Sequence, residues 1–157
     1  MKEAGYPVPL FAVIDGRKGV ETVIQEFYNI PVQICQSHKI ATIDRYLLKH
    51  PRRESYRELK RIAHDMTRTD KATFIWMLER FQAEYAKDME AKILNPKTLR
   101  YRVSHPRLHR AYKSLVRDID RLFISLDFIQ SIKQNINTTN RIECVFSHLK
   151  PKVKIHR

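Results

Sequence analysis

Glycine and cysteine are scarce in this sequence, and acidic residues are outnumbered by basic ones. Only three of its 157 residues are glycine while 30% are charged, a combination that favours long helices with solvated faces over an all-β fold. The two cysteines are too few for a disulfide framework, and they fit a reducing compartment. Apolar residues still make up 43% of the chain, so we expect a globular fold with a real core rather than disorder.

Long apolar runs are absent as well. No stretch approaches the roughly 20 residues that a membrane-spanning helix needs. The first ten residues, MKEAGYPVPL, lack the apolar core of a signal peptide. The sequence therefore predicts a cytoplasmic protein with no membrane partner.

Positive charge is abundant, with 30 Lys and Arg against 17 Asp and Glu and a net charge of +13. Such an excess points to a polyanionic partner, which is DNA, RNA or an anionic membrane surface. Within residues 97–117, basic side chains interleave with aromatic ones and mostly avoid the Leu108/Tyr112/Leu115 stripe. A solvated helix face explains this pattern without function, but the charge excess favours phosphate contact, and a core-like stripe argues against a membrane surface. The candidate nucleic-acid-binding residues are Arg100, Arg102, Arg107, Arg110, Lys113, Arg117, Lys150 and Lys152.

The order of apolar and polar residues predicts an α/β fold that is dominated by helices. An apolar run at 8–14, a helical pattern at 19–28 and a β-like run at 32–35 form a strand-helix-strand unit, so we expect a parallel pair of strands. The following hundred residues are predicted to be all-helical. Helices are expected at 38–49, 54–66 and 70–90, and another is expected to start after Pro106. Asn137–Asn140 would cap a last helix that runs to about residue 150.

Two acidic residues stand out by position. Asp15 directly follows the first strand, where α/β sheets place ligands, although an Asp-Gly turn is the plainer interpretation. Glu143 is predicted to lie off the buried stripe of the last helix. Asn140 with Glu143 three residues later also matches a helix capping box, so a structural role stays open.

Cysteine, histidine and tryptophan offer weaker signals. Cys35 and His38 form a Cys-x2-His pair after the second strand, and Cys144 with His148 could complete a zinc site, but nothing shows that the pairs meet. Packing and hydrogen bonding explain Cys35 and His38 locally, so zinc is not expected. Trp76, the single tryptophan, is predicted to pack in the core, with stacking against DNA bases as the alternative.

These features occur in an order that resembles one family, the bacterial insertion-sequence transposases related to eukaryotic Mutator-like elements. The matching segments are VIDGRKGV at 13–20, VQICQSHKI at 32–40 and NTTNRIECVFSHLKPKVKIH at 137–156, and the run from Arg100 to Leu115 is similar to the helical run ahead of the family's Glu motif. The resemblance covers essentially the whole chain and is most specific in its last twenty residues.

The resemblance implies a partial RNase H-like core that cuts and joins DNA with an Asp-Asp-Glu site. Asp15 would be the second catalytic Asp and Glu143 the Glu, and both would bind Mg²⁺ or Mn²⁺; Cys35, His38 and Asn140 would lie near the active site. Residues 1–37 would be the second half of the core, 38–136 a helical insertion, and 137–157 the catalytic helix with a basic tail. The partners would be transposon ends and target DNA, and the full-length protein would be a homo-oligomer that is nucleoid-associated when bound to DNA.

The first Asp of such a site has no candidate here, because Glu3 is the only acid before Asp15. We therefore expect a C-terminal portion of a transposase that does not transfer strands by itself. The alternatives are an inactive, basic nucleic-acid-binding remnant and a structural zinc protein.

Overall fold

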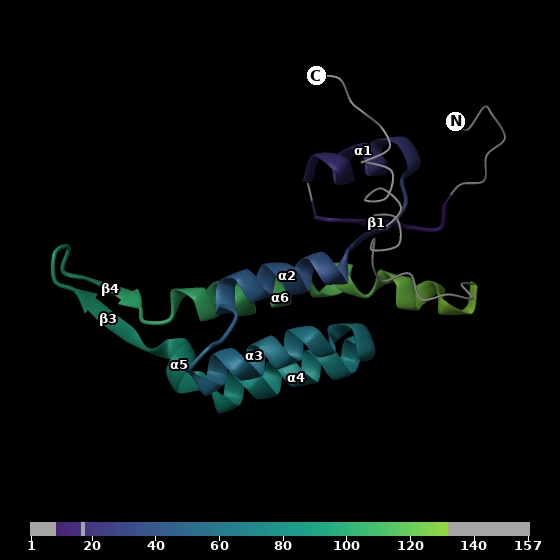
Figure 1. Ribbon diagram of the computed structural model, residues 1–157. Helices are drawn as coiled ribbons and strands as arrows, with labels where there is room; N and C mark the ends of the chain where they lie inside the picture. The colour runs from purple at the N-terminus through teal and green to yellow at the C-terminus, as the bar shows by residue number, and fades with distance from the viewer. Residues whose placement is uncertain (1–8, 17, 132–157) are drawn as a thin grey trace, which may run out of the picture. The chain divides into compact units, whose positions relative to one another are not determined.

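The computed structural model describes residues 9–16 and 18–131, and these residues form two compact units (Figure 1). The strand unit contains 9–16, 18–38 and 121–131, so it is built from two separate stretches of the chain. The helical unit is the continuous stretch Lys39–Asp120. Across both units the fold is helix-dominated, with a few short strands in two small sheets.

The strand unit contains a β-α-β element made of β1 (Ala12–Ile14), α1 (Lys18–Tyr28) and β2 (Val32–Ile34). The two strands pair in parallel with Ile14 opposite Ile34, which confirms the predicted parallel pair. The first strand is shorter than predicted, because among the described residues 9–14 only the last three are in strand conformation. After β1 the chain turns at Gly16, whose φ of +90° is a conformation that residues with a side chain rarely adopt.

Two buried glutamines join the second stretch of the strand unit to β2. Gln33 on β2 accepts a hydrogen bond from the Ser125 backbone N–H at 2.6 Å. Gln36, just after β2, donates its side-chain N–H to the Leu122 carbonyl at 2.8 Å. The η3 helix (Ile124–Ser131) is thereby held beside β2.

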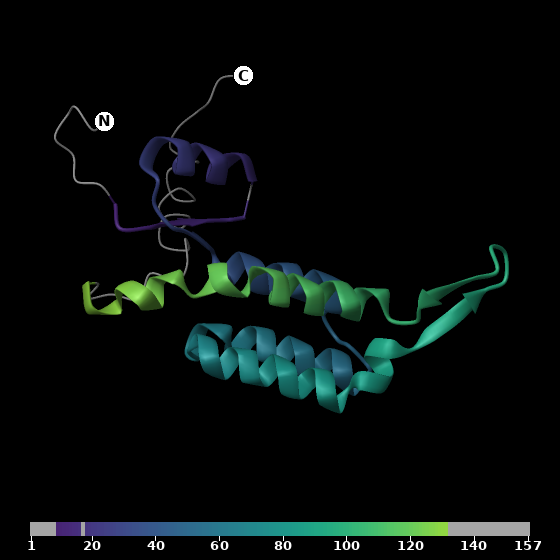
Figure 2. The same cartoon turned by 180° about the vertical axis from the view of Figure 1, so that it is seen from behind.

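The helical unit is built mainly from four longer helices. These are α2 (Gln36–Leu47), α3 (Glu54–Asp65), α4 (Lys71–Glu84) and α6 (Pro106–Leu122), with the short helices η2 (Met66–Arg68) and α5 (Ala86–Glu90) beside them. Both cartoon views place α2 beside α6 and α3 beside α4 (Figures 1 and 2). Each longer helix buries one apolar stripe, and the largest fully buried side chains are Phe74, Phe81, Ile43, Leu47, Leu59, Ile62, Met66, Leu108 and Leu115. The predicted helices agree with these four to within a few residues, except that the third divides into α4 and α5.

A β-hairpin between α5 and α6 corrects the prediction of an all-helical segment at 38–136. Strands β3 (Lys92–Asn95) and β4 (Arg100–Val103) pair antiparallel, with Leu94 opposite Tyr101. Pro96 cannot continue a helix. The Asn95 side chain accepts the Lys97 N–H at 3.0 Å, and the Asn95 carbonyl accepts the Leu99 N–H at 2.8 Å, so local turn chemistry closes the hairpin.

Trp76 is a second correction, because the prediction that it packs in the core is wrong. Its side chain is 55% exposed on α4, while Phe74 and Leu78 on the same helix are buried. Two residues along a helix turn the side chain by about 200°, so Trp76 points away from the stripe that contains Phe74. Arg80, one turn later, lies over the Trp76 ring at 5.7 Å from its centroid.

None of the helices that the structure describes is both long enough and apolar enough to cross a bilayer.

Candidate functional site

Asp15 lies at the carboxyl end of the two-stranded parallel sheet, as its position in the sequence predicts. It is exposed and directly follows β1. Cys35 directly follows β2, and its backbone N–H donates to the Ile14 carbonyl at 2.7 Å, so the residues that end the two strands are neighbours at one edge. His38, half-buried, lies in the first turn of α2. Asp15 is therefore the accessible acid of this edge.

Cys35 is completely buried, with an exposed fraction of 0%. A thiol in that position packs as a small apolar group. Within 9–16 and 18–131, no three side chains of His, Cys, Asp or Glu are grouped so that they could hold a metal ion. Glu143 and Asn140 lie outside the described residues, as do Lys150, Lys152 and the Cys144/His148 pair. Any approach of Glu143 to Asp15 therefore remains a prediction.

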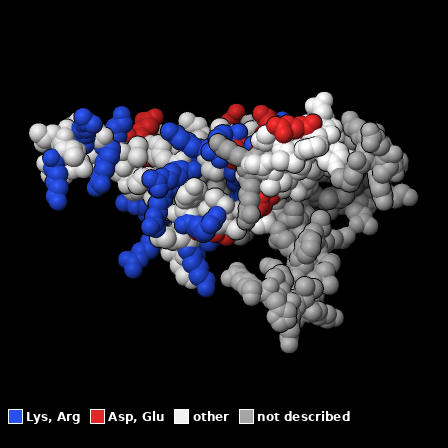
Figure 3. All heavy atoms as spheres, turned by 90° about the horizontal axis from the view of Figure 1, so that it is seen from above, with Lys and Arg blue, Asp and Glu red and all other residues white. Residues whose placement is uncertain are grey.

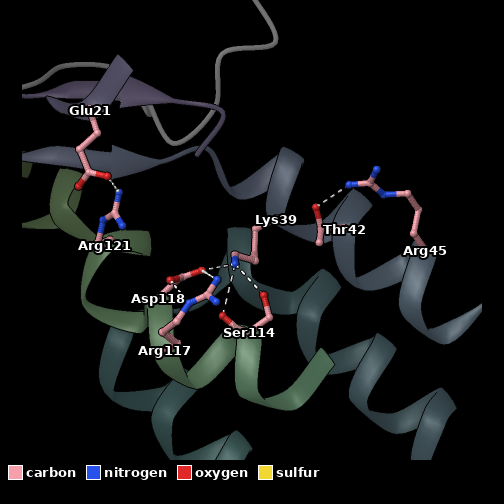
Figure 4. Close-up of polar contacts among 8 residues, drawn as sticks. All are labelled: Glu21, Lys39, Thr42, Arg45, Ser114, Arg117, Asp118 and Arg121. Carbon is pink, nitrogen blue, oxygen red and sulfur yellow. Dashed lines mark hydrogen bonds and ion pairs between the residues drawn. The ribbon is translucent and has the colours of Figure 1, made fainter. Parts of the chain in front are cut away.

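The stretch that leads toward Glu143 is anchored in the strand unit. Besides the two glutamine contacts, the Phe128 ring on η3 stacks on Phe11 beside β1, with ring centroids 5.4 Å apart. At the end of α6, the Arg121 guanidinium pairs with Glu21 on α1 at 2.7 Å (Figure 4). Sequence periodicity predicts none of these contacts, since each of them joins residues about 90 or more positions apart.

The helical unit carries a basic face on α6. Arg107, Arg110, Lys113 and Arg117 are all exposed, as the sequence pattern predicts. Three of them form a hollow of about 560 Å³ together with Tyr46 and parts of α6, and its lining consists of Tyr46, Arg110, Tyr112, Lys113, Ser114, Val116 and Arg117. Among the side chains that the structure describes, Arg107, Arg110 and Lys113 have no ion-pair partner. Their charges are thus available to an external anion.

A buried polar cluster lies under this face and was missed by the sequence analysis (Figure 4). Lys39 on α2 contacts the Asp118 carboxylate on α6 and donates to Ser114 Oγ at 2.9 Å. Arg117 donates two hydrogen bonds to the same carboxylate, at 2.8 and 2.9 Å. A signal existed in the sequence. Lys39 lies four residues before Ile43 on one apolar stripe, and Asp118 lies between Leu115 and Leu122 on another.

The Asp118 carboxylate stays ionised far into the acid range. Burial raises its pKa, but the hydrogen bonds from Arg117 and Lys39 and their positive charges lower it more, to about 2. The hydrogen bonds to Asp118 and the negative charge of its carboxylate raise the pKa of the Arg117 guanidinium. The cluster fixes the orientation of α6 against α2 and so positions the basic residues on the outer side of α6.

Tyr112 connects the hollow on α6 to α4. Its hydroxyl donates to the Gln82 side chain at 2.6 Å, and its ring stacks on Phe81. Burial and the nearby Glu79 raise the pKa of this tyrosine. A second hollow of about 590 Å³ opens beyond Tyr112, but Glu79 and Glu90 are part of its lining, which makes it a poorer site for an anion.

The β3–β4 hairpin adds a second group of basic residues. Lys92, Lys97, Arg100 and Arg102 are all exposed, and none of them forms an ion pair with a residue of the described ranges. The space-filling view shows Lys and Arg side chains over the end of the molecule that carries the hairpin and over the helices next to it, with few acidic side chains between them (Figure 3). The predicted contribution of Arg100 and Arg102 therefore comes from a strand rather than from a helix.

Comparison of the chain with protein-family models, with curated proteins and with solved structures finds no match.

Proposed function

We propose that this chain supplies catalytic and DNA-binding residues of a DNA transposase. Asp15 and Glu143 are two acids of an Asp-Asp-Glu site that binds Mg²⁺ or Mn²⁺, and the strand unit is part of an RNase H-like core. The basic residues of the helical unit hold transposon ends and target DNA, and the working protein is a homo-oligomer on the nucleoid. The resemblance of three sequence segments to Mutator-related transposases motivates the proposal.

The observation that carries the proposal is that Asp15 and the stretch that leads to Glu143 belong to the same strand unit. Asp15 is exposed at the carboxyl edge of the sheet, where α/β folds place their ligands. Phe128 stacks on Phe11 near the start of β1, and Gln33 holds the backbone of Ser125. Ser131 ends this anchored stretch, twelve residues before Glu143. Twelve residues can span up to roughly 40 Å, which is ample for the two carboxylates to meet.

The residue types fit the chemistry. Strand cleavage breaks a phosphorus–oxygen bond as a water oxygen attacks phosphorus in line and the 3′-oxygen leaves. In strand transfer, that 3′-hydroxyl then attacks a target phosphate, and the 3′-oxygen of the target strand leaves. Divalent ions, when bound, stabilise the attacking and the leaving oxygen. Asp15 offers the hard carboxylate oxygens that Mg²⁺ prefers, whereas the thiol of Cys35 is buried. Lys and Arg on the helical unit contact phosphates and set the register of the DNA.

Metal binding tests the acidic site directly. We expect Mn²⁺, followed by calorimetry and electron paramagnetic resonance, to bind the chain and to bind at least several-fold more weakly to Asp15→Asn and to Glu143→Gln. Asp127→Asn is the matched control, because Asp127 is an exposed acid on η3 of the same unit and its replacement changes the charge equally. Equal weakening by all three substitutions would mean that net charge alone determines Mn²⁺ binding, and Asp15 and Glu143 would then not be metal ligands.

A second function, nucleic-acid binding without catalysis, is favoured by the basic residues on α6 and on the hairpin that have no ion-pair partner among the described side chains. Both functions predict binding that weakens steeply with salt, with a log–log slope of roughly −0.9 for each phosphate neutralised on duplex DNA. The two functions differ in what they predict for the acidic residues Asp15 and Glu143. Mn²⁺ binding that depends on Asp15 and Glu143, and strand transfer lost in Glu143→Gln when all catalytic segments are supplied, support the transposase. Salt-sensitive binding with no specific metal site supports the binding module.

A further inference from the structure

The β3–β4 hairpin stands out from the helices of its unit as an arm. Both cartoon views show it extending past the ends of α5 and α6 (Figures 1 and 2). Leu99 at its turn is 75% exposed and Tyr101 is 72% exposed, so the rest of the helical unit does not cover these side chains. Two strands without a third element against them are marginally stable by themselves. An uncovered hairpin of this kind is suited to a partner.

The arm has two different faces. Cross-strand partners share a face, and successive residues alternate between faces. Arg100 and Arg102 therefore lie on one face, opposite Asn95 and Ile93 respectively. The other face carries Leu94 with Tyr101 and Lys92 with Val103. One face thus concentrates two guanidinium groups, while the other is mostly apolar.

The charge of the arm has one sign. Residues 92–103 contain four basic residues and no acidic residue. The chain continues from the arm into α6, whose outer side presents Arg107, Arg110 and Lys113. From Arg107 to Lys113 the helix rises about 9 Å. The arm and the α6 face thus form a continuous series of positive charges in the chain, which matches a polyanion with regularly spaced charges.

We infer that the hairpin arm enters the major groove of duplex DNA with its Arg100/Arg102 face toward the base edges, while the basic face of α6 contacts the phosphates. The major groove of B-DNA is about 12 Å wide and admits a two-stranded β-ribbon. Arginine is the side chain that binds guanine O6 and N7 with two hydrogen bonds. This inference shares with the proposed function only the premise that DNA is the partner, and it requires no metal chemistry.

Other partners fit the arm less well. Duplex RNA has a deep and narrow major groove that side chains cannot read. Pairing with a second copy of the arm would place its four positive charges against the four of the first copy, and these like charges would repel. An anionic membrane could bind the Leu94/Tyr101 face of the arm. The apolar side of α6 is buried in the core, so the arm alone would insert apolar surface into the membrane.

Dimethyl sulfate footprinting tests the arm, because this reagent methylates guanine N7 in the major groove. The probe is a DNA duplex that the full chain selects from a random pool. Arg100→Ala/Arg102→Ala removes the guanidinium face, and Lys92→Ala/Lys97→Ala is the matched control with the same loss of charge from the other face and the turn. All four side chains are exposed, so both variants are expected to melt at the wild-type temperature.

The full chain is expected to protect guanine N7 positions. The Arg100→Ala/Arg102→Ala variant should lose this protection and bind DNA at least tenfold more weakly. A good bidentate base contact changes binding roughly five-fold to more than a hundredfold. The Lys92→Ala/Lys97→Ala variant should bind all sequences more weakly and keep the N7 protection. The slope of its log affinity against log salt concentration should be smaller. Equal effects of the two pairs, absent N7 protection, binding to duplex RNA as strong as to DNA, or stronger binding to vesicles of anionic lipid would each overturn the inference. The metal-binding test of Asp15 and Glu143 uses none of these variants, so the two proposals can fail separately.

Discussion

Removal of the Lys39 charge should destabilise the protein far more than removal of a lysine from a surface ion pair. Lys39 and Asp118 have side chains only 6% and 8% exposed, so Lys39→Met leaves a buried carboxylate without one of its two cationic partners. Breaking a buried pair in this way costs about 3–5 kcal/mol. Arg117 still donates two hydrogen bonds to Asp118, so we expect the lower end, about 3 kcal/mol. At roughly 2–4 °C for each kcal/mol in a chain of this size, Tm should fall by about 6–12 °C.

Thermal and urea unfolding followed by circular dichroism measure this loss. Lys71→Met is the control, because Lys71 pairs with Asp120 at 2.8 Å but the two side chains are 45% and 82% exposed. Exposed pairs contribute at most about 1 kcal/mol, so this variant should remain close to wild type. The double variant Lys39→Met/Asp118→Leu removes the unpaired charge and should recover most of the loss. A Lys39→Met chain as stable as Lys71→Met would refute the conclusion that the cluster stabilises the packing of α2 against α6.

Two further predictions follow from the same unit. Because the pKa of Asp118 is lowered to about 2 from 3.8, its contribution is complete above pH 3.8 and is lost as the pH falls through 2. Wild type should therefore lose about 2 kcal/mol more than Asp118→Asn over that interval in urea titrations, and parallel pH profiles would contradict the assignment. On α4, Trp76→Ala should change the free energy of unfolding by no more than about 0.5 kcal/mol, while Phe74→Ala should cost about 3–5 kcal/mol. Trp76 is the only tryptophan, so unfolding of Trp76→Ala is followed by circular dichroism instead of fluorescence. A large fall in the free energy of unfolding of this variant would show that the exposed position of Trp76 is wrong.

Local patterns were enough to predict the β-α-β element and the four longer helices. The apolar run that ends at Asp15-Gly16 and the stripe of α6 are signals that lie within one element. The hairpin was missed because a search for helical spacing treats Ile93, Leu94, Leu99 and Tyr101 as part of a helical region, while the turn chemistry of Asn95 and Pro96 indicates a break. The hydrophobicity of Trp76 predicts burial, but its angular position on α4 places it on the exposed side of the helix.

The candidate site was predictable only in part. The position of Asp15 at the end of a strand followed from the sequence, and so did the exposure of the α6 cations. The buried contacts of Lys39, Gln33 and Gln36 did not, because each joins residues at least 75 positions apart and no periodicity reports such pairs. The convergence of Asp15 with Glu143 is still a prediction from motif resemblance.

The discontinuous strand unit also has a consequence for synthesis on the ribosome. Gln36 needs the Leu122 carbonyl, which is added 86 residues later, and Gln33 needs Ser125, which is added 92 residues later. At about 5–20 residues per second, the partners arrive roughly 4–18 s after the glutamines. The helical unit, by contrast, is one uninterrupted stretch and can fold as it emerges. During this interval β1, α1 and β2 are exposed to chaperones and to neighbouring nascent chains, so the strand unit is the part of the protein whose folding a pause in translation or a chaperone would control.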